Sequence, residues 1–404
     1  MHILILHRVP DTLVRYTEAI DHDAHQVSYV GVPERLATIP AGVPCRRLSR
    51  PGTGDTATEV LAAIEGLPRP DRVIALSEYD LLAAAKVREV LGLPGPHVEQ
   101  AQLTRDKVRM KAAVAAHGLR VPRFLPLAAA LTGGPTGVPW TGRSVLKPRA
   151  GATSEGVLIF DGVAPLLDHV ATLKDPDLVD DLEVEEFVEG PILHIDGLVA
   201  NGKPLTVVAS RYVDSCLAFA QGRPVGSVQL PTDSALVDWT MDCLAAVAVD
   251  TGPFHLEAIE TPTGPVFLEV GARFGGADIV DTFELATGVH LPTSQLRLLV
   301  DGPGGWPDPR EPGPDEQYGW FVLPGHQLDS RYCRIDGEQE FRDDPLVHRW
   351  VQHRPDVPVT KEVTYTDTEN PLAGIVGPAP AAELERFLTR MFATVTVTAA
   401  APPA

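Results

Sequence analysis

Two glutamates stand where core residues would be expected in FHLEAIETPTGPVFLEVGARFGG, residues 254 to 276. The apolar runs that flank TPTGP predict a hairpin in which Glu257 and Glu269 are direct cross-strand partners, with Cβ atoms about 4.5 to 5.5 Å apart. Like charges placed opposite each other destabilise a sheet. A divalent cation, a shared proton or the nearby Arg273 would each relieve that repulsion. The pair is therefore a candidate site for Mg²⁺ or Mn²⁺, which prefer oxygen ligands.

The hairpin also needs an apolar face. Strand alternation places four residues on the side opposite to the two glutamates, where they are expected to supply core: Leu256, Ala258, Leu268 and Val270.

Two lysines upstream could bind an anion. Lys107 stands in the first turn of a helix predicted within TRDKVRMKAAVAAHGLRVP, where the helix dipole disfavours a cation by about 0.3 to 1 kcal/mol unless an anion docks there. In that helix Thr104 is the expected N-cap, and the expected apolar stripe is Val108, Ala112 and Ala115. Lys147 ends the apolar run SVL and needs a partner if it is buried. A solvated lysine is the alternative reading of Lys107.

Two further segments offer polar groups. In RAGATSEGVLIF, glycines surround Thr153 and Ser154, so this loop either closes over phosphates or forms an ordinary hairpin turn. In LEVEEFVEG, alternation separates Glu185 from Glu186, so at least one carboxylate points toward apolar neighbours. That strand could meet a flat base with its backbone, or it could be a solvated edge.

The elements that must position these residues fall into three groups. The first group is a small open α/β unit over about the first 100 residues. It is predicted from two strand-like runs, HILIL and RVIAL, and two helices, one over 55–67 and one within EYDLLAAAKVREVLGLPG. From about residue 140 strands dominate, and Asn201-Gly202 predicts a type I′ hairpin turn rather than a phosphate loop. After the Pro- and Gly-rich stretch from residue 301, three strand-like runs (YGWFVL, CRIDG, KEVTY) and the helix AAELERFLTRMF predict a small α+β unit.

Composition excludes several classes of protein. The chain has 404 residues, 44% of them hydrophobic, and a formal net charge of -20, which disfavours nucleic acid or an anionic membrane as partner. The four cysteines are scattered without a CxxC pair, which fits neither a disulfide framework nor a zinc site. No apolar run has the length of a signal peptide or a membrane span, so a cytoplasmic location is expected.

Taken in order, five motifs resemble those of the ATP-grasp superfamily: RDKVRMKAAVAAHGLRVP, VLKPRAGATSEGV, VEEFVEG, FHLEAIE and FLEVGARFGG. Within it, the chain looks most like carboxylate-amine ligases of the L-amino-acid ligase type, whose fold is similar to that of biotin carboxylase. The resemblance implies a multidomain α/β and α+β chain with an N-terminal pre-ATP-grasp domain (1–103), an ATP-grasp domain of two subdomains (104–300, lid at about 120–185) and a C-terminal α+β domain (301–404).

The resemblance also implies roles for individual residues. Lys107 and Lys147 would contact ATP phosphates, Thr153 and Ser154 would lie in the lid over them, and Glu257 and Glu269 would bind Mg²⁺ or Mn²⁺. The adenine hinge would be Glu185, Glu186 and Val188, with Glu189 near the ribose. Arg273, with Lys147, would assist phosphoryl transfer. Substrate contacts are expected from Glu78, His194, Asp196, Gly275 and Gly276.

The sequence departs from the family pattern at two positions. Gly271 stands where many relatives have an asparagine as a further metal ligand, and Ile192 stands where they commonly have an acidic residue. The expected reaction is ATP-dependent amide formation between a small carboxylic acid, such as an amino acid, and an amine, through an acyl-phosphate. The alternatives are a bicarbonate-using carboxylase or carbamoyl-phosphate type of enzyme, and a non-catalytic nucleotide-binding relative. By analogy a homodimer is expected.

Overall fold

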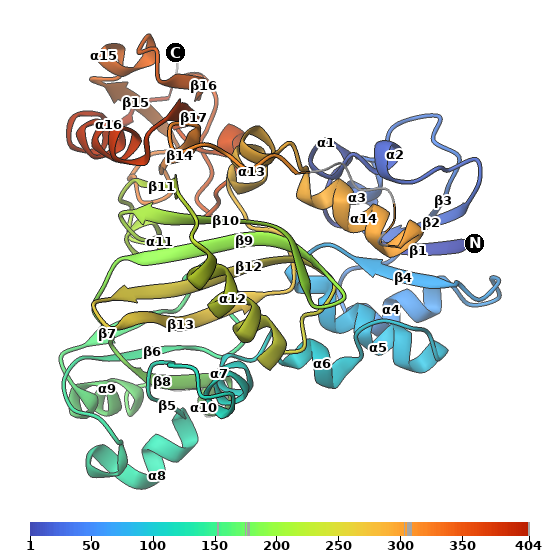
Figure 1. The fold of residues 1–404 in the computed structure, drawn as a ribbon, viewed down its shortest axis with the longest axis horizontal. Helices are drawn as coiled ribbons and strands as arrows, with labels where there is room; N and C mark the ends of the chain where they lie inside the picture. Colours follow the sequence, from blue (N-terminus) through green and yellow to red (C-terminus); the bar gives the residue numbers. More distant parts are fainter. Residues whose placement is uncertain (152, 174, 176–177, 303, 305–308, 403–404) are drawn as a thin grey trace.

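A computed structural model describes residues 1–151, 153–173, 175, 178–302, 304 and 309–402. Its first sheet is parallel and runs in the order β3-β2-β1-β4, as Figure 1 shows on the N-terminal side. The strands are β1 (His2–Leu6), β2 (Gln26–Gly31), β3 (Arg46–Ser49) and β4 (Arg72–Ala75). The run HILIL is buried on both faces, as expected for the centre of a parallel sheet. This confirms the open α/β arrangement of the first 100 residues.

Helices cover both faces of this sheet. On one face lie α4 (Thr56–Ala63), capped by Asp55, and α5 (Leu81–Leu91), which ends at Gly92 in the left-handed conformation. The other face packs against segments from far along the chain, including α13 (Ile279–Thr287) and α14 (Leu291–Asp301). The short elements here are α1 (Asp11–Val14), α2 (Tyr16–Ala19), α3 (Pro33–Leu36), η1 (Glu78–Asp80) and α6 (Val98–Gln102).

A second, antiparallel sheet of four strands has the order β5-β8-β6-β7. The strands are β5 (Phe124–Pro126), β6 (Ser144–Pro148), β7 (Leu158–Phe160) and β8 (Leu182–Glu186). Leu146 and Val184 face α8 (Leu127–Gly137) and α9 (Val163–Val170), which cover one side. The opposite side carries charged residues and faces the rest of the molecule; α10 (Leu178–Asp181) leads into β8.

The largest sheet has eight strands in the order β13-β12-β9-β10-β11-β14-β17-β16. Its first part contains β9 (Ile192–Ala200), β10 (Lys203–Val213), β11 (Val225–Leu230), β12 (Gly252–Thr261) and β13 (Gly264–Gly271), with α11 (Cys216–Ala220) before β11. The predicted turn joins β9 to β10, with positive φ at Asn201 and Gly202. On one face α7 (Lys107–Ala116) and α12 (Ser234–Ala246) enclose an apolar core.

The C-terminal segment extends this same sheet. Its strands β14 (Gln317–Leu323), β17 (Leu372–Ala379) and β16 (Val347–Gln352) follow β11 and pack against α16 (Ala381–Thr394). The remaining elements are β15 (Tyr332–Asp336), β18 (Thr396–Ala400), α15 (Gln339–Arg342) and η2 (Asp367–Glu369). The expected strand KEVTY is irregular backbone, whereas β16 and β17 lay outside the predicted strands. The division into three domains therefore stays a prediction.

The predicted face of α7 is wrong. Asp106, not Thr104, caps the helix by accepting from the backbone N–H groups of Val108 and Arg109. Ala112 and Ala115 are exposed and Val108 is half-buried. The buried face is instead Lys107, Met110, Lys111 and Val114. A search for apolar periodicity missed it because half of this inward face consists of lysines whose charges have partners.

One residue of the glutamate hairpin is also reassigned. A bulge after Glu257 shifts the pairing so that Ala258 lies opposite Phe267. Phe267 is therefore the buried core residue, and Leu268, expected in the core, lines a cavity instead. Leu256, Ala258 and Val270 are buried as expected. A bulge adds one residue to one strand, which reverses the side that following residues face.

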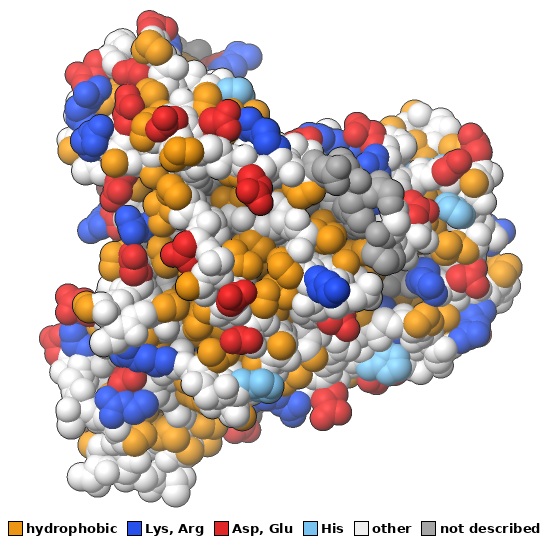
Figure 2. Space-filling model, viewed as in Figure 1, with side chains coloured by type: hydrophobic (Ala, Val, Ile, Leu, Met, Phe, Trp, Pro, Cys, Tyr) orange, Lys and Arg blue, Asp and Glu red, His pale blue; other side chains and the backbone are white. Residues whose placement is uncertain are grey.

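Among the helices of the described residues, none combines the length and the apolar character needed to cross a lipid bilayer. On the face shown in Figure 2, basic side chains stand among acidic ones and form no single basic patch.

Candidate functional site

Glu257 and Glu269 are direct cross-strand partners in β12 and β13, as the sequence predicts. Both carboxylates line a cavity of about 500 Å³. The cavity lies between the four-stranded antiparallel sheet and the eight-stranded sheet, which Figure 1 shows one above the other. The hairpin thus supplies one wall of a pocket large enough for a nucleotide-sized ligand.

The two walls of this cavity are largely apolar. Val145 and Ile159 come from the four-stranded sheet, and Ile259 and Leu268 come from the opposite hairpin. Phe187, just after β8, also lines the cavity and carries the Arg143 guanidinium 3.9 Å above its ring centroid. A flat aromatic group can lie between such walls, while charged groups gather at the glutamate end.

Lys107 joins the helix start to the glutamate hairpin. Its Nζ lies 3.0 Å from Oε2 of Glu269 and donates to the backbone oxygen of Gly151 at 2.8 Å. Burial alone would raise the pKa of Glu269, but Lys107 and Lys147 outweigh it and lower that pKa to about 2. Glu269 is therefore a carboxylate at neutral pH, available to a cation.

Two residues that line the cavity, Lys147 and Glu185, belong to a buried network of four charges. Lys147 in β6 donates to Glu185 at 3.0 Å and lies 3.8 Å from Glu183. Lys111, fully buried, donates to Glu183 at 2.8 Å and to Glu185. Burial lowers the pKa of Lys147, but the nearby glutamates outweigh this and raise it above its usual range. The network holds the Lys147 ammonium at the cavity edge, although Glu185 is thereby used as an ion-pair partner.

Sequence reasoning missed Lys111 and Glu183. Lys111 follows Lys107 by one helical turn, and Glu183 precedes Glu185 by one strand repeat, so each lies on the same face as a predicted residue. The sequence therefore contains a signal for this network: two lysines spaced four residues apart in one helix, and two glutamates spaced two residues apart in one strand.

The remaining expected nucleotide contacts differ in position. Ser154, Glu186 and Val188 line the cavity. The Glu186 side chain, however, turns away to accept from Arg123 at 2.7 Å. Thr153 is not among the cavity-lining residues; it and Ser154 have positive φ, which gives the loop a sharp local turn. Glu189 is exposed and lies outside the lining.

Arg273 is brought to Glu78, 195 residues away in sequence. Arg273 Nε donates to a Glu78 oxygen at 2.6 Å, and Arg105 contacts the other oxygen. Burial lowers the pKa of Arg273, but Glu78 and Glu269 raise it above the usual range. Neither Arg273 nor Glu78 lines the cavity, so the two lie just beyond its glutamate end.

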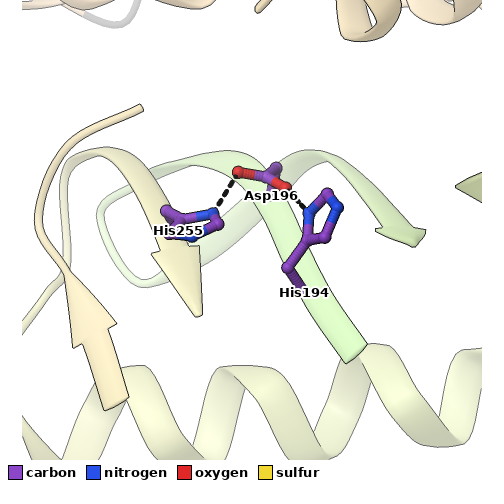
Figure 3. A group of neighbouring side chains, drawn as sticks. All are labelled: His194, Asp196 and His255. Atoms are coloured by element: carbon purple, nitrogen blue, oxygen red, sulfur yellow. Dashed lines mark hydrogen bonds and ion pairs between the residues drawn. The ribbon is translucent and has the colours of Figure 1, made fainter. Parts of the chain in front are cut away.

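His194, Asp196 and His255 form a buried cluster on the same sheet face as Glu257. Figure 3 shows one imidazole on each side of the Asp196 carboxylate, His194 from β9 and His255 from β12. Nδ1 of His194 lies 2.5 Å from Asp196, and Nδ1 of His255 lies 2.8 Å from its other oxygen. Burial lowers the pKa of His255, but Asp196 and Glu257 raise it to about 10. The predicted substrate contacts include His194 and Asp196 but not His255.

Gly275 packs against this cluster. A Cβ at Gly275 would lie 2.8 Å from Oδ1 of Asp196 and 2.7 Å from Cδ1 of Ile279, so any side chain there would push Asp196 or Ile279 out of place. Gly276 is exposed, and a Cβ there would meet open space.

The donor set at the glutamate end fits a divalent cation. Two carboxylates face each other across the hairpin, and Tyr212 donates to Oε1 of Glu257 at 2.9 Å. The described contacts of Glu269 use Oε2. Oxygen donors of this kind suit Mg²⁺ or Mn²⁺.

The chain was compared with protein families and with curated proteins. No family model matches the chain. It is 25% identical over 248 residues to the L-arginine-specific L-amino acid ligase of Bacillus subtilis, an alignment of 57% of this chain and 58% of that relative. The chain thus spans little more than half the length of this curated relative.

Solved structures are similar over nearly the whole chain. The L-amino acid ligase from Bacillus licheniformis has a TM-score of 0.71 at 20% identity, covering 99% of this chain and 98% of that one. A biotin carboxylase domain from Hydrogenobacter thermophilus, solved with MgADP and bicarbonate, has a TM-score of 0.58 at 14% identity, covering 98% and 90%. At these identities the similarity establishes the fold.

Proposed function

We propose that this chain, which has the ATP-grasp fold, is an ATP-dependent ligase that joins a small carboxylic acid, such as an amino acid, to an amine. The observation that carries the proposal is the meeting of Glu257, Glu269, Lys107 and Lys147 at one end of an apolar-walled cavity. Such a site separates a nucleotide base from its charged phosphates. The ligase relatives and the MgADP complex of a structural neighbour support this reading.

The residues divide the work along the cavity. The base would lie between Val145 and Ile259, and the phosphates would meet the ammonium groups of Lys107 and Lys147. Glu257 and Glu269 would hold the divalent cation, which offsets negative charge on the transferring phosphoryl group when bound. Arg273 lies next to this end and would offset further charge once an acid substrate competes with Glu78 for it.

The reaction has two bond exchanges. An oxygen of the acid substrate forms a bond to the γ-phosphorus of ATP as the bond to the β-phosphate oxygen breaks, releasing ADP. The amine then attacks the acyl carbon of the acyl-phosphate, and inorganic phosphate leaves with the electron pair and takes up the proton that the amine nitrogen loses. The loop at Ser154 and the two sheets would exclude water, which would otherwise hydrolyse the acyl-phosphate.

Two rival functions remain distinct. A structural neighbour was solved with bicarbonate, so the acid could be bicarbonate rather than an amino acid. A non-catalytic nucleotide-binding protein would keep the lysines without need for the glutamate pair.

The proposal also includes a division into three domains, a homodimer and a cytoplasmic location. The four cysteines are all unpaired, which agrees with a reducing compartment.

Phosphate release tests the proposal. The protein with ATP, Mg²⁺ and pooled amino acids should release phosphate and form an amide product detectable by mass spectrometry. Glu257→Gln and Glu269→Gln should each abolish release without loss of fold. Glu260→Gln, on the same hairpin but paired with Arg211, is the matched control and should remain active. Activity in both cavity variants would refute the assignment, and release with bicarbonate alone would favour the carboxylase.

A further inference from the structure

His255 lies directly across the hairpin from Gly271. Directly opposed residues of an antiparallel pair project their side chains to the same face. Here that face is the one that carries Glu257 and Glu269. The imidazole therefore stands beside the carboxylate pair, at the level where Gly271 contributes no side chain.

Gly271 leaves its space to Arg273. A Cβ built on Gly271 would lie 3.3 Å from Cγ and 3.6 Å from Nε of Arg273. A longer side chain at this position would displace Arg273 from Glu78. An additional metal ligand at this level of the hairpin must therefore come from the opposite strand.

The His255 ring is oriented as a metal-binding histidine would be. Its Nδ1 faces Oδ1 of Asp196 at 2.8 Å, and its Nε2 points toward Oε1 of Glu257 at 3.6 Å. Metal-binding histidines commonly donate one ring N–H to a carboxylate and ligate through the other nitrogen. Adjacent ligand atoms on an octahedral ion with bonds of about 2.1 Å lie about 3 Å apart, close to the separation seen here.

Asp196 is itself held in place from its far side. The ring of His194 contacts Asp196 through Nδ1 at 2.5 Å and Ser227 Oγ through Nε2 at 2.5 Å. Ser227 Oγ in turn donates to the backbone oxygen of Arg211 at 3.2 Å. This chain of bonds fixes the Asp196 carboxylate against His255.

A cation between the two histidines is the alternative, since ligand atoms of His194, Asp196 and His255 all lie within 4.8 Å of one another. The hydrogen bonds argue against it. Both nitrogens of His194 and the Nδ1 of His255 are engaged by oxygen partners, which leaves only Nε2 of His255, on the Glu257 side.

We propose that Nε2 of His255 is a ligand of the divalent cation held by Glu257 and Glu269, that the cation takes the place of the Nε2 proton, which is released to solvent, and that Asp196 positions the ring. The inference rests on the proposed function, because it concerns the same cation. An imidazole ligand shifts the preference of a carboxylate site from Mg²⁺ toward Mn²⁺ and later transition metals. Asp196 is a positioning residue, since it acts through His255.

The test is electron spin echo envelope modulation of Mn²⁺ bound with ADP to the full chain. Histidine nitrogen coupling should appear in the wild-type protein and change when the protein carries ¹⁵N-histidine, which separates it from adenine nitrogens. The coupling should disappear in His255→Asn and persist in His194→Gln. His255→Asn should also weaken Mn²⁺ binding more than tenfold, with a smaller effect on Mg²⁺.

The outcomes separate this inference from the proposed function. Mn²⁺ with ADP bound without histidine coupling overturns the inference alone, and so does coupling lost in His194→Gln but kept in His255→Asn. Failure to bind Mn²⁺ with ADP at all refutes both. If His255→Asn does not fold, Asp196→Asn replaces it: Mn²⁺ affinity should fall by about 10 to 100-fold, and unchanged affinity would overturn the positioning role.

Discussion

The ammonium group of Lys107 lies 3.0 Å from a carboxylate oxygen of Glu269, so the start of α7 and the glutamate hairpin meet across 162 residues of chain. The contact places a cation at a helix N-terminus, where the helix dipole disfavours it, beside a carboxylate that compensates it. When a triphosphate and a divalent cation bind, the Lys107–Glu269 ion pair would give way to two new interactions: Lys107 with a phosphate, and Glu269 with the metal ion.

Lys107→Met should weaken ATP binding. Loss of a charged hydrogen bond to phosphate costs about 1.5 to 3 kcal/mol, which corresponds to roughly 10- to 100-fold in affinity. Titration calorimetry with ATP measures it. Lys203→Met, at an exposed lysine that begins β10, is the control and should bind as the wild type does. Equal affinity in both variants would show that Lys107 does not meet the phosphates.

Lys111→Met should destabilise the fold. The substitution leaves Glu183 and Glu185 buried without their closest cation, and breaking a buried pair from one side costs about 3 to 5 kcal/mol. Urea unfolding monitored by circular dichroism gives the free energy of unfolding. The double variant Lys111→Met with Glu183→Gln should recover part of the loss. A single variant as stable as Lys203→Met would contradict the network.

Gly275→Ala should impair the site, whereas Gly276→Ala should be neutral. An added Cβ at Gly275 meets Asp196 and Ile279 within 2.8 Å, and at Gly276 it meets open space. We expect at least a tenfold loss of phosphate release and a melting temperature lower by several degrees for the first variant only, since overpacking costs about 1 to 3 kcal/mol. Equal behaviour of the two would show that the loop relaxes freely.

Asp278 should make a contribution to the free energy of unfolding that decreases as the pH rises. Burial raises its pKa from 3.8 to about 6 despite the ion pair with Arg349. Because the folded state then holds the proton more tightly than the unfolded state, this stabilisation is present below pH 4 and is lost as the pH rises through 6. At about 1.4 kcal/mol per pKa unit, the wild type should lose up to about 3 kcal/mol over this range relative to Asp278→Asn.

Urea unfolding at pH 4, 5, 6 and 7 checks the Asp278 prediction. The exposed Asp238→Asn in α12 is the control and should keep the wild-type slope. Parallel pH curves for the wild type and Asp278→Asn would contradict it.

Features with local causes were predictable from the sequence. The Asn201-Gly202 turn sets the register of β9 and β10, because short loops bring their own flanks together. The TPTGP loop likewise sets the start of the β12–β13 register, with Thr261 opposite Gly264, but Glu257 meets Glu269 only because the bulge adds Leu268 to β13. The five-residue run HILIL predicted a buried strand, and β1 occupies those residues. The likeness to known ligases in fold agrees with the motif order read from the sequence.

Other features depended on contacts between distant segments. The apolar pattern of α7 misled because Lys111 is neutralised by Glu183, 72 residues away, a partner that hydrophobic periodicity cannot include. Leu268 changed sides because of a bulge, whose position depends on how the strands pack rather than on local preference.

The sequence by itself determined the first strand, the two hairpin turns and the order of the motifs, since these depend on periodicity, turn residues and short-range pairing. Only the tertiary structure decided that Arg273 rests on Glu78 and that His255 stands between Asp196 and Glu257. The reason is physical: a charged side chain takes the partner that burial leaves within reach, and burial is a property of the assembled sheets.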